Sequence, residues 1–234
     1  MTDTAPFSWT VLLPVKVLAQ AKSRLAVLAG ERRGDLALAL ASDTAAAVLA
    51  CPAVTRVVVI SSDQVAGPRL AALGAIVVPD EPADRRGFTV TSDLSLGGAQ
   101  DGLNAALRYG AAVAAARWPG TGLAALTADL PALRPAELAT ALNAAARAGG
   151  PAFIPDAAGV GTTLYAVPRG GDFRPLFGGA SRARHASGGA TELELGGIAG
   201  LRRDVDTPDD LRTALALGAG PRTTDLATVL LANA

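Results

Sequence analysis

Three cationic side chains lie close together near the start of the chain, in the segment P-V-K-V-L-A-Q-A-K-S-R-L. They are Lys16, Lys22 and Arg24, and the other 18 of the 21 basic residues are all arginine. In a chain that otherwise uses arginine, a lysine indicates a position where a compact ammonium group is needed. The segment follows an apolar, β-rich run, so it predicts a cationic loop that holds phosphate groups. The alternative is that both lysines are ordinary surface residues.

Three aspartates supply the opposite charge. Asp129 follows an apolar run in T-A-D-L-P-A-L, and Asp204 and Asp206 stand two residues apart in R-R-D-V-D-T-P-D-D-L. Side chains alternate along an extended segment, so Asp204 and Asp206 would point to the same face. Together with Asp129 they would form a hard oxygen site suited to Mg²⁺ that bridges substrate phosphates. The alternative is structural: Asp129 caps a turn before Pro131, and Asp206 or Thr207 caps the helix that follows.

Two glycine-containing segments offer backbone N–H groups without bulk. They are G-V-G-T-T at 159–163 and F-G-G-A-S at 177–181, and the second is followed by Arg182, Arg184 and His185. Such segments favour a phosphate or carboxylate ligand, because consecutive N–H groups and cations both attract anions. A plain hairpin turn explains the first segment about as well, and the histidine can equally be an isolated surface residue.

Composition excludes several classes of protein. The 234 residues are 50% apolar and carry 21 basic and 21 acidic side chains, which argues against non-specific nucleic-acid or anionic-membrane binding. No apolar run approaches the roughly 18 residues of a spanning helix, and no basic leader precedes the first apolar run. One cysteine excludes an intramolecular disulfide, and one histidine excludes a multi-histidine metal site. We therefore expect a soluble cytoplasmic protein with a single domain over residues 1–234.

Apolar β-branched runs alternate with alanine- and leucine-rich helical patterns along the chain. The predicted strands are 9–15, 56–61, 75–78, 122–127, 152–154 and 162–167, and the predicted helices are 31–49, 68–73, 101–117, 135–148 and 207–217. This alternation predicts βαβ crossovers, and hence an α/β fold with a mainly parallel central sheet and helices on both faces.

Ligands of such sheets bind outside the carboxyl ends of the strands. That rule selects the loop after Val15, the end of the second strand at Ser61, and Asp129 after the fourth strand. The stretch 79–100, rich in glycine, aspartate and serine, is either a lid over this site or a plain surface loop. Neither a G-x-x-x-x-G-K-[ST] nor a G-x-G-x-x-G motif is present, so any nucleotide must be held by another design.

The ordered set of motifs resembles the guanylyltransferases of coenzyme F420 biosynthesis, which activate phosphoenolpyruvate or 2-phospho-L-lactate. These enzymes belong to the Rossmann-like nucleotidyltransferases. The resemblance covers nearly the whole chain and runs through P-V-K-x-L-x-x-A-K-S-R-L, D-x-L-N-x-A, A-D-L-P-A-L, G-x-G-T, F-G-x-x-S-x-x-R-H and D-V-D-T-P-x-D-L. Each motif is short, but their order is specific to this family.

The resemblance implies a role for each matching residue. The expected Mg²⁺ ligands are Asp129, Asp204 and Asp206; the expected phosphoenolpyruvate-binding residues are Thr162, Gly178 and Ser181; the expected catalytic and triphosphate-binding residues are Lys16, Lys22 and Arg24, with Asn104 near the nucleoside. The stretch 79–100 is longer and less acidic than the corresponding loop of the relatives, so contacts from it to the base do not carry over.

The implied reaction transfers GMP from GTP to phosphoenolpyruvate and releases pyrophosphate. A phosphate acceptor is already an anion at neutral pH, so the site needs cations and positioning rather than a nucleophile–histidine pair. The alternatives are the same chemistry on 2-phospho-L-lactate or 3-phosphoglycerate, and a non-catalytic nucleotide-binding protein of the same fold. The product would be a labile mixed anhydride, which makes direct transfer to the downstream enzyme of the pathway plausible. The sequence leaves the oligomeric state open.

Overall fold

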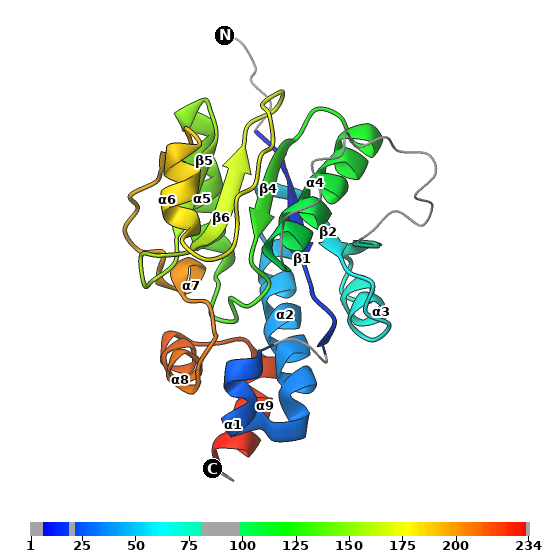
Figure 1. Ribbon diagram of the computed structural model, residues 1–234, viewed down its shortest axis with the longest axis vertical. Helices are drawn as coiled ribbons and strands as arrows, with labels where there is room; N and C mark the ends of the chain where they lie inside the picture. The colour runs from blue at the N-terminus through cyan, green and yellow to red at the C-terminus, as the bar shows by residue number, and fades with distance from the viewer. Residues whose placement is uncertain (1–6, 19–21, 81–98, 233–234) are drawn as a thin grey trace.

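A seven-stranded sheet with the order β3-β2-β1-β4-β6-β5-β7 forms the centre of the computed structural model, which describes residues 7–18, 22–80 and 99–232 (Figure 1). The strands are β1 (Trp9–Pro14), β2 (Val54–Ile60), β3 (Ile76–Val78), β4 (Gly122–Leu126), β5 (Ala152–Pro155), β6 (Thr162–Val167) and β7 (Thr191–Glu192). Strand β1 is parallel to β2 and to β4, and β2 is parallel to β3. Strand β6 is antiparallel to β4 and β5, and β7 is parallel to β5. The expected mainly parallel sheet is confirmed.

Helices connect these strands and cover both faces of the sheet. They are α1 (Ala26–Ala29), α2 (Arg33–Leu49), α3 (Ala66–Ala71), α4 (Ala99–Arg117), α5 (Pro135–Ala148), α6 (Ser181–Ser187), α7 (Ala199–Arg202), α8 (Pro208–Leu217) and α9 (Pro221–Ala232), with 3-10 turns at Ser23–Leu25 and Gly30–Arg32. Apolar residues of α2, α3 and α5 pack on one face of the sheet, and those of α4 pack on the other. In Figure 1, α4 lies in front of the sheet and α2 behind it.

Helix α4 approaches the sheet closely at Gly110. A Cβ atom at this position would lie 2.4 Å from the Cδ1 atom of Ile60 on β2, so the backbone can pack at this distance only because glycine has no side chain. The buried residues Leu107 and Ala114 lie on the same face of the helix. This packing sets the distance between α4 and the sheet near the carboxyl end of β2.

Strand β1 is the point at which the chain switches from adding strands on one side of the sheet to adding them on the other. From β1 the chain adds β2 and β3 on one side, and it then returns to place β4 on the other side. In open α/β sheets the crevice at such a reversal, beyond the carboxyl ends of the two flanking strands, is the usual ligand site. Here those ends carry the Lys16 loop after β1 and the Asp129 loop after β4.

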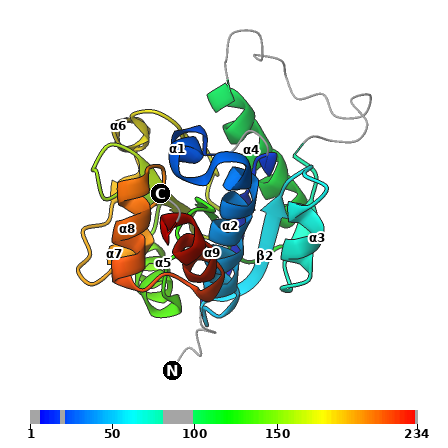
Figure 2. The same ribbon diagram turned by 90° about the horizontal axis from the view of Figure 1, so that it is seen from below.

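A third group of helices lies beyond this edge of the sheet. Figure 1 shows α1, α8 and α9 at the lower end of the molecule, and Figure 2 shows α9 beside α2. Their apolar side chains form a separate buried cluster with residues of α2, which includes Leu36, Leu40, Leu211 and Leu230. These helices lie beyond the carboxyl ends of β1 and β4, next to the expected ligand site.

Asp43 on α2 holds the start of α9. Its side chain is 1% exposed, accepts hydrogen bonds from the backbone N–H of Thr223 (2.7 Å) and of Arg222 (3.4 Å), and pairs with the Arg222 guanidinium. We expect Asp43→Ala to lower the free energy of unfolding by about 2–3 kcal/mol, because charge-assisted hydrogen bonds and a helix cap are lost. Urea denaturation measures this; a change below 0.5 kcal/mol would show that Asp43 does not anchor α9.

The structure corrects several expected boundaries. The helix expected at 31–49 begins as a 3-10 turn, the helix expected at 101–117 starts at Ala99, and the helix at 207–217, expected to close the fold, is followed by α9. The helix 135–148 is confirmed, with Pro135 in its first turn and Gly149 in the left-handed conformation after its end. Most of the stretch 79–100, residues 81–98, lies outside the described residues.

Candidate active site

A cleft of about 380 Å³ opens between the carboxyl ends of β1 and β4. Its lining includes five of the residues singled out from the sequence, together with Leu103 of α4 and two alanines of α2. These five are Lys16, Lys22, Arg24, Asp129 and Asp206. The structure therefore brings the cationic loop and two of the three carboxylates to the same cleft, at the reversal point of the sheet.

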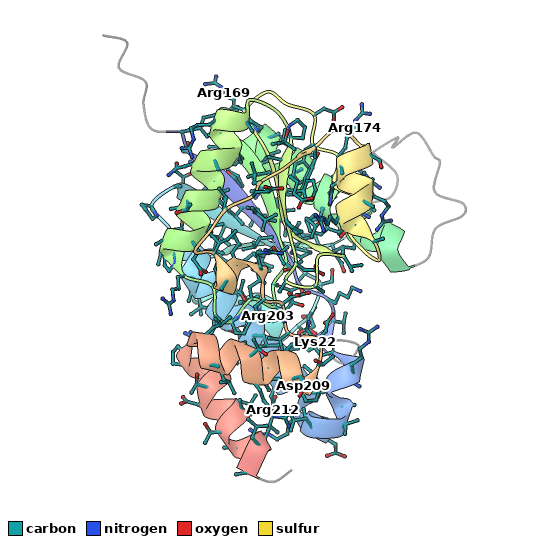
Figure 3. The ribbon with its side chains drawn as sticks, turned by 90° about the vertical axis from the view of Figure 1, so that its left-hand side faces the viewer. Lys22, Arg169, Arg174, Arg203, Asp209 and Arg212 are labelled. Carbon is teal, nitrogen blue, oxygen red and sulfur yellow. The ribbon has the colours of Figure 1, made fainter. Side chains whose placement is uncertain are left out.

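Lys22 lies between the carboxylates of the cleft. Its Nζ atom contacts Oδ2 of Asp129 and lies 2.8 Å from Oδ1 of Asp206, and its side chain is 12% exposed. Burial by itself would lower the pKa of this ammonium, but the charges of Asp129 and Asp206 outweigh burial and raise the pKa above its usual value. Figure 3 shows Lys22 between the sheet and the helices below it. The backbone of Lys22 has φ 54°, a left-handed conformation that side chains rarely adopt.

The Asp129 loop is held in place by backbone hydrogen bonds on three consecutive residues. The carbonyl of Asp129 accepts from the Val205 N–H (3.1 Å), the Leu130 N–H donates to Thr44 Oγ1 (2.9 Å), and the carbonyl of Pro131 accepts from the Gly220 N–H (2.8 Å). Helix α2, the 203–207 segment and the start of α9 therefore position one loop. The bond from Val205 also fixes Asp204 and Asp206 beside Asp129.

Asp204 and Asp206 flank the buried Val205 in an irregular segment before α8. Asp204 is half-buried, whereas the Asp206 side chain is 52% exposed. Burial, and then the charges of Asp129, Asp206 and Asp156, raise the pKa of Asp204 to about 7. The neighbouring carboxylates thus disfavour the ionised form of Asp204 in addition to burial. Thr207, rather than Asp206, caps α8, through a reciprocal pair of hydrogen bonds with Asp210.

Thr162, at the start of β6, and Ser181, at the start of α6, are not among the residues that line the cleft. Both are buried, at 5% and 2% exposure. Thr162 Oγ1 lies 3.0 Å from Nδ1 of His185, and Nε2 of His185 accepts a hydrogen bond from the Leu176 N–H (2.9 Å). An acceptor Nε2 requires the proton to reside on Nδ1, so the neutral ring donates to Thr162.

His185 is a buried core residue and not the surface histidine that the sequence allowed. It is 1% exposed, and its ring stacks on Tyr165 at 4.7 Å between centroids. Burial, and then the charge of Arg184, lower its pKa to about 4. The ring is therefore uncharged at neutral pH and does not attract an anion by charge.

The two glycine segments differ in what they hold. In the segment 159–163, the carboxylate of Asp156 accepts from the N–H groups of Val160 (2.9 Å) and Gly161 (2.8 Å), so these donors already bind an internal anion. In the segment 177–181, Gly178 has φ 98° and Gly179 has φ 44°. The nearby Arg182 forms a two-pronged ion pair with Glu192, at 2.8 and 2.9 Å, and thus binds an internal carboxylate.

Comparison with known proteins places this arrangement in a family. Over 223 residues the chain is 55% identical to the phosphoenolpyruvate guanylyltransferase of Thermomonospora curvata, with 95% of this chain and 90% of that protein covered. It is also 55% identical to the phosphoenolpyruvate guanylyltransferase of Streptomyces coelicolor over 224 residues, or 95% and 97% of the two chains. No protein-family model matches the sequence. The chain belongs to the phosphoenolpyruvate guanylyltransferase family.

Solved structures agree with this family in fold. The crystal structure of 4-diphosphocytidyl-2C-methyl-D-erythritol synthase superposes with a TM-score of 0.54 at 15% identity, over 90% of this chain and 99% of that one. At this identity the likeness shows the Rossmann-like nucleotidyltransferase fold alone. Within the described residues of this guanylyltransferase-family chain, no helix is long and apolar enough to cross a membrane.

Two buried hydroxyl groups lie beyond the end of β4: that of Thr127, which was not predicted from the sequence, and that of Thr163, which belongs to the predicted 159–163 segment. Thr127 lines the cleft, and its backbone N–H donates to the carbonyl of Thr163 (3.0 Å). The Oγ1 atoms of both threonines are buried and have no hydrogen-bond partner among the described residues. The pairing of β6 with β5 passes from Leu164 directly to Thr162, so a β-bulge lies at Thr163. In this family member, the hydroxyl of the predicted Thr162 contacts His185, whereas the hydroxyl of Thr163 has no hydrogen-bond partner among the described residues.

Asp63 is a second residue that motif analysis missed. Its Oδ2 atom accepts from the Leu18 N–H (2.9 Å), and Oδ1 accepts from Val65 (2.9 Å) and Ala66 (2.8 Å) at the start of α3. Its slight burial raises the pKa, but these three N–H donors outweigh that effect and lower the pKa overall. Asp63 therefore ties the cationic loop after β1 to the end of β2. The signal in the sequence was the position of Asp63, which follows the predicted strand 56–61.

The carboxylate cluster suits a divalent cation by its chemistry. Oδ1 of Asp129 is buried without a partner among the described residues, and the single charge of Lys22 pairs with two of the three aspartates, Asp129 and Asp206. Hard carboxylate oxygens are the ligands that Mg²⁺ prefers. In the described part of the chain, however, no three acidic, histidine or cysteine side chains already stand in a metal-binding arrangement. Because Lys22 pairs with Asp129 and with Asp206, an ion bound there would compete with this ammonium.

Proposed function

We propose that the chain transfers GMP from GTP to phosphoenolpyruvate, which yields enolpyruvoyl-2-diphospho-5'-guanosine and pyrophosphate. The observation that carries this proposal is the cleft at the sheet reversal, where Lys16, Lys22 and Arg24 face Asp129 and Asp206. It occurs in a chain that is 55% identical to two phosphoenolpyruvate guanylyltransferases over 95% of its length. The proposed activity assigns the cleft to the nucleotide and the 176–181 region to the three-carbon acid.

The chemistry follows from the charges that the chain presents. A phosphate oxygen of phosphoenolpyruvate attacks the α-phosphorus of GTP, and the bond to the bridging oxygen of the β-phosphate breaks, so pyrophosphate leaves with the electron pair. The nucleophile is already an anion, so no general base is needed. Lys16 and Arg24, at the mouth of the cleft, would hold the triphosphate and offset the charge that develops on pyrophosphate.

The residues that would hold Mg²⁺ are Asp129 and Asp206, with Asp204 beside them. When bound, the ion supplies charge neutralisation for the phosphate oxygens. Lys22, released from these carboxylates, would then be available to the triphosphate, as the family resemblance implies. In the structure Lys22 is paired with both carboxylates, so this role requires its side chain to leave them.

The decisive experiment measures pyrophosphate release from GTP and Mg²⁺, coupled to inorganic pyrophosphatase, with the products identified by mass spectrometry. Phosphoenolpyruvate, 2-phospho-L-lactate and 3-phosphoglycerate are offered separately. We expect a GMP adduct with phosphoenolpyruvate. An adduct with another acid alone would overturn the acceptor and keep the chemistry. Tight GTP binding with no release from any acid would instead support the non-catalytic alternative.

The product of this reaction is a mixed anhydride that water can hydrolyse. The enzyme that consumes it must therefore accept it soon after its release, and we extend the proposal to a direct transfer to the downstream transferase of coenzyme F420 biosynthesis. Supplying that enzyme in the same assay should raise the yield of the final product relative to the yield when the two steps are separated in time.

A further inference from the structure

The side chain of Asn104 on α4 holds the backbone of Phe177 through both of its polar atoms. Nδ2 donates to the Phe177 carbonyl at 3.1 Å, and Oδ1 accepts from the Phe177 N–H at 2.9 Å. Asn104 is 6% exposed and Phe177 is 4% exposed, so water does not compete freely for these bonds. Only a side chain with both a donor and an acceptor at this reach can satisfy the two backbone groups.

Helix α6 holds the neighbouring residues of the same loop. His185 accepts the Leu176 N–H, and Arg184 donates to the carbonyl of Phe177 (3.1 Å) and to that of Gly178. Three consecutive residues thus have backbone groups fixed by side chains, with Asn104 as the contribution from the other side of the loop. Gly178, which comes next, has φ 98° and permits the turn into α6.

We propose that Asn104 is a positioning residue for the acceptor acid: it sets the 176–181 loop in the conformation that binds phosphoenolpyruvate. The inference rests on the proposed function, which assigns this loop to the acceptor. Asn104 is next to Leu103, which lines the cleft. The first turns of α4 therefore contact both the nucleotide cleft and the acceptor loop, and they fix the separation of the two substrates.

This role predicts a selective kinetic effect. Loss of the two bonds would free the loop at Phe177 and displace Gly178 and Ser181, so phosphoenolpyruvate would bind less well. The cationic loop of the cleft is held independently by Asp63, through the Leu18 N–H. GTP binding should therefore change little, which separates this role from a contact between Asn104 and the nucleoside.

The test compares Asn104→Leu with the wild-type protein. Leucine has a similar volume and removes both bonds, and we expect the KM for phosphoenolpyruvate to rise about ten- to thirty-fold while the KM for GTP changes less than threefold. Thr10→Val is the matched control, because it removes a buried side-chain hydrogen bond to Thr121 at the amino end of β1. It should leave both KM values unchanged. Should the leucine variant fail to fold, Asn104→Ser removes the same contacts with a shorter polar side chain.

Amide hydrogen exchange gives a readout that needs no turnover. In Asn104→Leu the amides of residues 176–181 should exchange at least tenfold faster, and in Thr10→Val they should not. Unchanged exchange, or a KM effect on GTP that equals or exceeds the effect on phosphoenolpyruvate, would overturn the positioning role. A wild-type protein that does not use phosphoenolpyruvate would overturn the proposed function instead, while the exchange measurement would still decide whether Asn104 orders the loop.

Discussion

Asp129→Asn is expected to lower the rate of pyrophosphate release about a thousandfold, with the fold retained. The amide keeps the size of the side chain, and the backbone of the loop around it is held by other groups. The Leu130 N–H donates to Thr44 Oγ1, and the Val205 and Gly220 N–H groups donate to loop carbonyls, so the substitution does not touch these bonds. What disappears is the negative charge that faces Lys22 and the buried oxygen suited to a cation. The rate constant under saturating GTP, Mg²⁺ and phosphoenolpyruvate measures this loss.

The control for Asp129→Asn is the same substitution at Asp209. That side chain is 91% exposed, belongs to the same acidic run as Asp206, and pairs with Arg212 on the surface of α8 (Figure 3). It should leave the rate within twofold, because an exposed ion pair of this kind contributes little. A rate loss below tenfold in Asp129→Asn would contradict the placement of the reaction in this cleft. Titration of Mn²⁺ onto both variants, with nucleotide present, separates weakened metal binding from a slower chemical step.

The fold was predictable because two periodic signals agreed along the chain. Continuous β-branched runs such as 56–61 and the alanine–leucine pattern of α2 each predict one element type, and their alternation leaves a parallel sheet as the arrangement that buries both. Helix α9 was not predicted, because its first turn is held by a residue that lies far away in the sequence. Asp43, nearly 180 residues earlier in the chain, receives its first N–H groups, and no local pattern reports such a contact.

The charged half of the candidate site could be predicted for a similar reason. Once β1 and β4 are recognised as parallel strands, the residues after them must share one edge, so Lys16 and Asp129 meet there whatever the details of the side chains. The partners of those side chains could not be predicted. Lys22 pairs with carboxylates in the structure, and Asn104 holds Phe177; both depend on how α4 and the loops pack.

Asp204→Asn is expected to stabilise the protein without added metal while it lowers activity. Burial and the neighbouring carboxylates raise the pKa of Asp204 to about 7, so its ionised form is disfavoured in the folded state. The pKa in the unfolded chain is near 3.8. The unfolded chain therefore loses this proton first as the pH rises from 4 to 7, and the wild-type protein loses stability over that interval. The full shift corresponds to about 4 kcal/mol by the linkage relation.

An asparagine does not titrate, so the variant escapes this loss. The difference in unfolding free energy between variant and wild type should be small at pH 4 and reach about 2–4 kcal/mol at pH 8, measured by urea denaturation in EDTA. His185 titrates in the opposite sense: with its pKa lowered to about 4, it makes the protein more stable as the pH rises towards 6.5. Because both proteins carry His185, the difference between them isolates Asp204.

Addition of Mg²⁺ turns this stability difference into a test of the site. A cation bound among the aspartates would offset the repulsion that raises the pKa of Asp204, so wild-type stability at pH 8 should rise towards that of the variant. A gain that is independent of pH would assign the effect of Asp204→Asn to packing instead. A stabilised variant with full activity would show that Asp204 takes no part in the reaction. The expected combination, higher stability with lower turnover, would follow from the proposed function, in which the repulsion among the three carboxylates is offset only when a cation binds.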